Sequence, residues 1–213
     1  MTQQKVVLLH GIGRTSKSML FIARHLRKQG YAVLNLTYPS TKLPLEALAE
    51  EIHAKIADFA EGATTHFVGH SMGGLLIRAY LTRYRPPTLG KVVMLGTPNH
   101  GSEVADFLKD WWLFRRVFGP AGQQLITNQA AIAPLFGPVD YPLAIIAGDR
   151  SLDVVCRHII GKPNDGKVSI ESTKLDGMAD HCVVPVSHLM LTYRRSVNRL
   201  IAQFLKEGRF GCE

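Results

Sequence analysis

The sequence predicts an α/β fold with a mainly parallel, doubly wound sheet, and three observations carry that prediction. Short apolar runs alternate along the chain with longer segments whose apolar residues recur at helical spacing. The apolar runs are continuous rather than alternating, as expected for strands covered by helices on both faces. A glycine-flanked serine, Ser71, lies between one such run and one such helical segment, where a strand turns sharply into a helix.

The expected elements follow one another in regular order. Six apolar runs predict strands at residues 5–9, 31–36, 65–68, 91–95, 141–147 and 181–186. Four amphipathic segments predict helices at residues 18–29, 44–61, 73–84 and 193–207. Gly30 ends the first helix, and the second carries Leu48, Ile52 and Ile56 on one face. We expect a single domain over residues 1–213, with a small helical insert.

The insert is the segment 101–138, which contains no predicted strand. Its aromatic residues form a broad apolar stripe, and four of them are candidate substrate-pocket residues: Trp111, Trp112, Phe114 and Phe118. Two interpretations stay open, namely a helix packed on the core and a small cap that lines an acyl pocket. A helix on a membrane surface is a third, although only Arg115 and Arg116 supply basic residues.

Composition and charge place the chain among ordinary globular proteins. Of its 213 residues, 46% are hydrophobic and 20% are charged, and no apolar run approaches the roughly 20 residues of a membrane span. The formal charge of +8 could suggest nucleic acid, but the basic residues fall on predicted helices without interleaved aromatic residues. They are interpreted as solvated helix faces, and no nucleic-acid partner is predicted.

The cysteines and the N-terminal segment favour a reducing compartment. Cys156, Cys182 and Cys212 form neither a disulfide framework nor a pair with metal-ligand spacing, and they are interpreted as incidental thiols. The apolar run 6–9 is too short for the core of a signal peptide. A cytoplasmic location is therefore expected.

The most informative motif is Gly69-His70-Ser71-Met72-Gly73, which has the form G-x-S-x-G of a nucleophile elbow. Glycines are needed on both sides of the serine because strand and helix pass too close for a β-carbon. The N-terminus of the following helix supplies N–H groups that favour developing negative charge. The His70 side chain is expected to leave the site side of the turn. The alternative is a serine that only caps the helix.

A serine nucleophile needs a base, and a histidine after the last strand is the candidate. His188 lies there, whereas His181 precedes the apolar run 182–186 of that strand and is expected at the other end of the sheet. The third member would be a carboxylate between the serine and the histidine. The candidates are Asp149, Asp153, Asp165, Glu171, Asp176 and Asp180. Strand positions alone do not separate Asp149, directly after a strand, from Asp165, in a glycine-containing turn.

Together these motifs resemble the α/β-hydrolase superfamily, and within it the small bacterial lipases and esterases of the triacylglycerol-lipase type. The resemblance covers nearly the whole chain, and four segments carry it: residues 10–13, 69–73, 96–102 and 164–168. It implies an α/β-hydrolase fold with an oxyanion loop at residues 10–13. It also favours Asp165 over Asp149 as the catalytic acid, and the backbone N–H groups of Ile12 and Met72 as the oxyanion hole.

The resemblance implies a carboxylic-ester hydrolase that works through Ser71, His188 and Asp165 and an acyl-enzyme, without metal or organic cofactor. The expected partner is a small-molecule ester or a lipid, with weak contact to a membrane surface. An acyltransferase, thioesterase or amidase on the same triad is the alternative, and a non-catalytic binding protein is the third. The fold does not fix the natural substrate, the acyl length or the oligomeric state.

Overall fold

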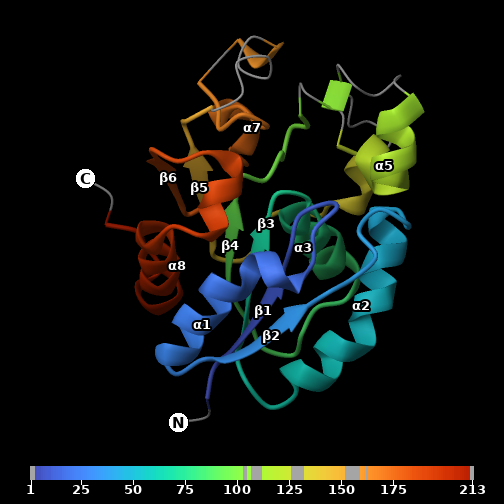
Figure 1. The fold of residues 1–213 in the computed structure, drawn as a ribbon. Helices are drawn as coiled ribbons and strands as arrows, with labels where there is room; N and C mark the ends of the chain where they lie inside the picture. Colours follow the sequence, from blue (N-terminus) through green and yellow to red (C-terminus); the bar gives the residue numbers. More distant parts are fainter. Residues whose placement is uncertain are drawn as a thin grey trace.

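The computed structural model describes residues 3–102, 105–106, 112–125, 132–151, 159–161 and 163–211. A six-stranded sheet runs through it in the order β2-β1-β3-β4-β5-β6, and every neighbouring pair of strands is parallel. The strands are β1 Lys5–Leu9, β2 Ala32–Leu36, β3 Thr65–His70, β4 Leu89–Leu95, β5 Leu143–Gly148 and β6 Asp180–Val184. The predicted parallel α/β architecture is confirmed (Figure 1).

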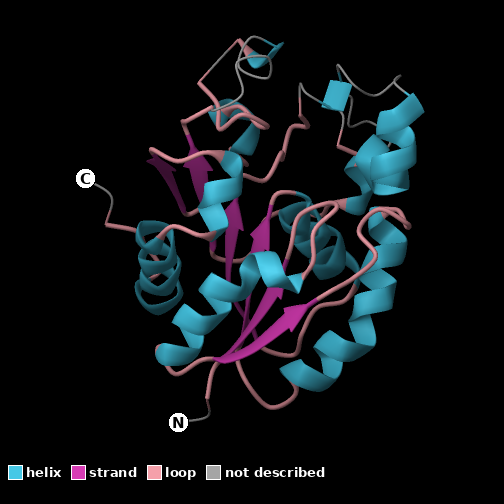
Figure 2. Ribbon diagram, in the orientation of Figure 1, coloured by secondary structure: helices cyan, strands magenta, loops and turns pink. Residues whose placement is uncertain are grey.

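Helices cover both faces of the sheet (Figure 2). The longer ones are α1 Leu20–Lys28, α2 Leu45–Ala60, α3 Met72–Arg83, α5 Trp112–Gln123 and α8 Arg195–Glu207. Successive residues of a strand enter different cores: Val7 and Leu9 pack with α2 and α3, whereas Val6 and Leu8 pack with α1 and α8. Because both faces of the sheet are buried, apolar residues occupy successive positions in the strands rather than alternate ones.

The register of the sheet brings the predicted functional loops to one edge. Leu9 at the end of β1 is level with Gly69 near the end of β3, and His70 is level with Leu95 at the end of β4. All strands are parallel, so the segments after β5 and β6 leave from the same edge. Ligands of open α/β sheets bind outside this carboxyl edge.

Several element boundaries differ from the sequence prediction for local reasons. β3 runs on to His70, so that Ser71 is itself the turn between strand and helix. The short helix α7 Ile170–Thr173, for which the sequence analysis predicted no element, follows the turn that carries Asp165. Ser169 caps it, accepting a hydrogen bond on its hydroxyl from the Ser172 N–H.

The described part of the insert packs on the α2–α3 side of the sheet. Helix α5 breaks at Gly119, whose φ is 59°, and Pro120 follows. Beyond the break, Ala121 and Leu125 are buried in the core that α2 and α3 share. The Gln124 side chain accepts a hydrogen bond from the N–H of Leu45 at the start of α2 (2.8 Å). The core-packed interpretation therefore holds for residues 121–125.

The interpretation of the cysteines as incidental thiols is wrong for Cys182. Its sulfur is disulfide-bonded. Disulfides persist in oxidising compartments, so the cysteines do not support a reducing one, and the cytoplasmic location stays a prediction. No helix within the described ranges is long and apolar enough to cross a bilayer.

Candidate active site

The turn between β3 and α3 holds Ser71 in a strained backbone conformation. Its φ of 54° makes it the only non-glycine residue with positive φ in the described part of the chain, a strain of roughly 1–3 kcal/mol that neighbouring contacts must enforce. The Ser71 N–H donates to the Leu95 carbonyl of β4 (2.8 Å), and the Ser71 carbonyl accepts from the Gly74 N–H (2.9 Å). The Ser71 hydroxyl makes no capping hydrogen bond to α3, so the cap-only alternative is not supported.

Two glycines allow strand and helix to meet at this turn. A β-carbon on Gly69 would lie 2.6 Å from the Gly74 nitrogen, and one on Gly73 would overlap the Leu9 carbonyl of β1. Real β-carbons do not approach backbone atoms this closely, so both positions require glycine. The close approach places the first turn of α3 against the strand ends. The backbone N–H groups of this first turn have no partner inside the helix.

His188 and Asp165 form a buried hydrogen-bonded pair. His188 begins the short helix after β6, and its Nδ1 donates to the Asp165 Oδ2 over 2.7 Å. The His188 backbone N–H donates to the Asp165 carbonyl (2.9 Å), so two bonds fix the pair. The other carboxylate oxygen accepts from the N–H groups of Lys167 and Val168 (3.0 and 2.9 Å). With Nδ1 as the donor, the ring's Nε2 is left as an acceptor.

The loop after β1 lies beside the elbow and is held by residues of the segment after β2. The Tyr38 ring stacks on the His10 ring at 4.1 Å, and the Tyr38 hydroxyl donates to the His10 carbonyl. His10 Nδ1 donates to the Gly11 carbonyl (2.8 Å), and the Gly13 N–H donates to the Ser40 hydroxyl (3.0 Å). These bonds fix the backbone around Ile12, the predicted oxyanion residue. The sequence analysis missed Tyr38 and Ser40, since no motif marks them.

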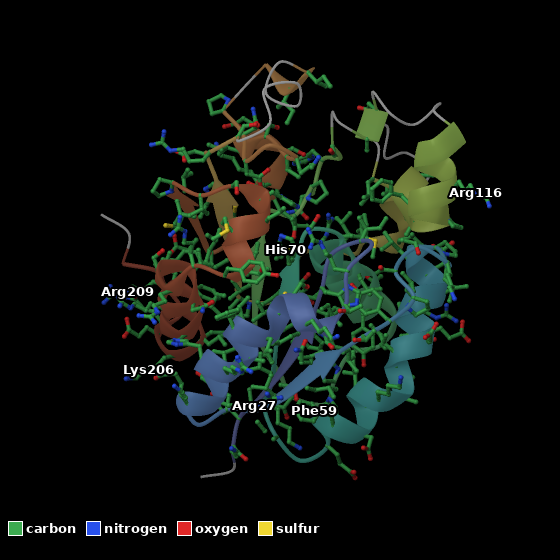
Figure 3. The ribbon with its side chains drawn as sticks, viewed as in Figure 1. Arg27, Phe59, His70, Arg116, Lys206 and Arg209 are labelled. Atoms are coloured by element: carbon green, nitrogen blue, oxygen red, sulfur yellow. The ribbon has the colours of Figure 1, made fainter. Side chains whose placement is uncertain are left out.

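The prediction for the His70 side chain is wrong, because it faces the site. Its ring lies 4.8 Å from the His188 ring, and its Nε2 donates to the His188 carbonyl over 3.0 Å. Figure 3 labels it near the strand ends, at the level of the predicted site. Burial, and next the nearby His188, lower the His70 pKa to about 3. The ring is therefore neutral at ordinary pH, and it links the elbow to the loop that carries His188.

These loops and the insert enclose a cavity of about 450 Å³. Ser71, His70 and His188 line it together with Ile12, and Phe118 faces them from the insert. Of the other predicted pocket residues, Trp111 lies outside the described residues, as do the side chains of Trp112 and Phe114. The remaining lining is mostly apolar: Pro98, Ala105, Leu125, Val168 and Leu189.

Two alternative candidates lie outside this cavity. The Asp149 carboxylate pairs with the neighbouring Arg150 over 3.4 Å and is partly exposed. His181 lies inside β6 rather than before it, and its Nε2 is hydrogen-bonded to the Thr173 hydroxyl (3.1 Å). No group of three or more His, Cys, Asp or Glu side chains gathers as a metal site within the described ranges.

Comparison with known proteins gives one family and several relatives. The family described as "Alpha/beta hydrolase family" matches residues 6–195. Proteins named triacylglycerol lipase from Pseudarthrobacter phenanthrenivorans and Burkholderia plantarii are both 32% identical over 120 residues, which is 51% of this chain. The match covers 37% and 33% of those proteins, respectively. A Bacillus licheniformis lipase in its mature form is similar in fold, with a TM-score of 0.74, 20% identity and coverage of 95% of this chain and 90% of that one.

Proposed function

Because the chain belongs to the alpha/beta hydrolase family, we propose that it hydrolyses carboxylic esters through an acyl-enzyme on Ser71. The observation that carries the proposal is the buried 2.7 Å hydrogen bond between Asp165 and His188, next to a cavity that His188 shares with Ser71. A serine hydroxyl becomes a strong nucleophile only when an oriented base removes its proton, and this arrangement supplies both the base and its orientation.

In the first half-reaction, the Ser71 oxygen bonds to the ester carbonyl carbon while His188 Nε2 takes the hydroxyl proton. Asp165 keeps the hydrogen on Nδ1 and stabilises the imidazolium that forms. The tetrahedral intermediate then collapses, the bond to the leaving oxygen breaks, and His188 returns the proton to the leaving alcohol. Water repeats the sequence on the acyl-enzyme, releasing the acid and restoring the Ser71 hydroxyl.

The negative charge of the intermediate would lie between the N–H groups of Ile12 and Met72. Met72 is the first residue of α3, where the helix N-terminus favours an anion. Ile12 lines the cavity in the loop that His10, Tyr38 and Ser40 hold. Removing one such donor costs roughly 3 kcal/mol of transition-state stabilisation.

The mostly apolar lining of the cavity supports esters with an alkyl acyl chain as substrates. Phe118, Leu125 and Leu189 supply apolar surface, and apolar burial is worth about 0.8 kcal/mol per methylene. We interpret the insert as one wall of this acyl pocket. The names of the curated relatives support ester or lipid substrates.

The test compares the wild type with Ser71→Ala on p-nitrophenyl esters of increasing chain length, with thioester and amide substrates in parallel. We expect turnover of esters by the wild type alone, and labelling of Ser71 by a fluorophosphonate probe. Unchanged turnover in Ser71→Ala, or labelling at another serine, would contradict the proposed nucleophile. Faster turnover of thioesters or amides than of esters would reassign the reaction on the same residues.

A further inference from the structure

The charges of the chain are strongly segregated along the sequence. Residues 1–45 and 181–206 contain no Asp or Glu but hold eleven Lys and Arg. The rest of the chain carries all 17 acidic residues against the remaining fourteen basic ones. The net charge of +8 therefore comes entirely from these two ranges, because the rest of the chain is slightly acidic. Such a charge asymmetry points to an anionic partner.

The fold brings the helices of the two acid-free ranges together on one side of the sheet. Helices α1 and α8 pack in the same layer and contact each other (Figure 1), and Figure 3 marks Arg27 on α1 and Lys206 on α8. The pKa of His25 on α1 is lowered by burial and by the charges of Arg199 on α8 and Lys28, so the cations of both helices act on the same place. We call the exposed basic residues here the basic face: Arg14, Lys17, Arg24, Arg27, Lys28, Arg194, Arg195, Arg199 and Lys206.

Two basic residues on the other side of the sheet have acidic partners instead. Arg85 forms a two-pronged pair with Asp140, and Arg83 lies 4.0 Å from Glu50. None of the ion pairs within the described ranges involves the basic face. The field of the basic face is therefore not neutralised by these ion pairs.

Large apolar side chains are exposed at the start of α1 and just before α8, and one of them lines the cavity. Phe21 on α1 is 49% exposed and meets the 37% exposed Tyr193 edge to face, with ring centres 5.5 Å apart. Leu189, four residues before Tyr193, is 48% exposed and lines the cavity. Arg14 of the basic face also lines the cavity. The apolar side chains thus connect the cavity mouth to the basic face.

We propose that the basic face docks on a bilayer of anionic phospholipid, with Phe21 and Tyr193 entering the headgroup layer and the cavity mouth held at the lipid surface. Basic residues attract an anionic leaflet, and exposed aromatic side chains add apolar burial at its interface. Nucleic acid would use the charges but would leave the exposed Leu189 and Phe21 in water, so a lipid surface fits both features. The inference adds a membrane partner to the proposed ester hydrolysis, and docking itself needs no catalysis.

The experiment measures binding of the full-chain Ser71→Ala variant to phosphatidylcholine vesicles with and without phosphatidylglycerol, by flotation. We expect binding to the anionic vesicles only, weakened by added salt. Replacing Arg24 and Arg195 by Gln should weaken binding about 25-fold, at roughly fivefold for each basic residue. The matched control replaces Lys55 and Arg83, on the opposite helical layer, by Gln, and should bind within about twofold of its parent. Phe21→Ala should weaken binding while leaving its salt dependence unchanged.

Equal binding to neutral and anionic vesicles would overturn the proposal, as would equal losses in the two double variants. Displacement from the vesicles by duplex DNA at lower concentration than by free anionic lipid would assign the basic face to nucleic acid instead. Circular dichroism melting of each variant shows whether a loss of binding is a loss of fold. Because Ser71→Ala carries the binding test, an inactive wild type would contradict ester hydrolysis and leave the docking result standing.

Discussion

The strand-end side of the cavity is held by directed hydrogen bonds, whereas the described residues of the insert present mainly apolar surface to it. On the first side, His188 is fixed by Asp165 and by His70, and each contact has a defined donor and acceptor. On the second side, the described lining residues are Ala105, Phe118 and Leu125, together with Ser102, whose hydroxyl donates to the Lys167 carbonyl. Directed bonds fix positions to fractions of an ångström, whereas apolar contact tolerates changes of size and shape. Substitutions on the strand-end side should therefore lower kcat steeply, whereas substitutions on the insert side should change the chain-length preference gradually.

The largest expected effect comes from breaking the directed bond to the base. Asp165→Asn should lower kcat by about 10⁴, because an amide can donate to Nδ1 and so favours the wrong imidazole tautomer. Steady-state kinetics on a soluble p-nitrophenyl ester measures the loss, with circular dichroism as a check on folding.

The matched control for this prediction is Asp149→Asn. Asp149 is partly exposed and pairs with Arg150, so its amide should leave kcat within about twofold, as for surface substitutions generally. Similar losses in both variants would mean that Asp165 is not the residue that orients His188.

An intermediate effect is expected in acid, and His70 on the strand-end side contributes to it. His70 has a folded-state pKa of about 3, against 6.5 in the unfolded chain. Between these two pH values His70 is protonated in the unfolded state but not in the folded state. The free energy of unfolding therefore decreases as the pH falls below 6.5. From pH 7 to pH 5 this amounts to about 2 kcal/mol of the free energy of unfolding.

Urea unfolding at the two pH values checks this contribution. His70→Gln should narrow the wild type's loss of stability between pH 7 and pH 5, whatever the variant's stability at pH 7. If His70→Gln loses as much stability as the wild type between pH 7 and pH 5, His70 must take up a proton in the folded protein. The charge would then lie inside the core on the His70 Nδ1, which has no partner within the described residues.

The separation of interacting residues along the chain decides what the sequence could predict. The elbow is local, since Gly69, Ser71 and Gly73 lie within five residues and each is required by backbone contacts at that turn. Asp165 was separated from Asp149 only by resemblance, because its bond to His188 spans 23 positions. A hydrogen bond between distant segments leaves no periodic pattern in the sequence.

The residues that were missed are those whose partners are far along the chain. Tyr38 holds His10 from 28 positions away, and His70 reaches a carbonyl 118 positions away. The course of the insert was not predicted for a similar reason. It breaks at Gly119, where a β-carbon would overlap the Thr41 carbonyl of another loop, and only the folded chain brings these two residues together.

The smallest effect should come from the insert side, and it sharpens the comparison most directly. Phe118→Ala removes apolar surface from the cavity, so it should raise KM for medium-chain esters about fourfold for each methylene that loses contact. KM for the acetate ester and kcat for all esters should stay nearly unchanged, because the directed bonds around His188 are intact. Phe136→Ala is the control, since Phe136 is also partly buried but packs under Arg78, outside the cavity lining. It should lower stability without changing chain-length preference. The opposite result would be that Phe118→Ala leaves the dependence of KM on acyl length as in the wild type and lowers stability as Phe136→Ala does. That result would show that the insert side supports the core and does not contact the acyl chain.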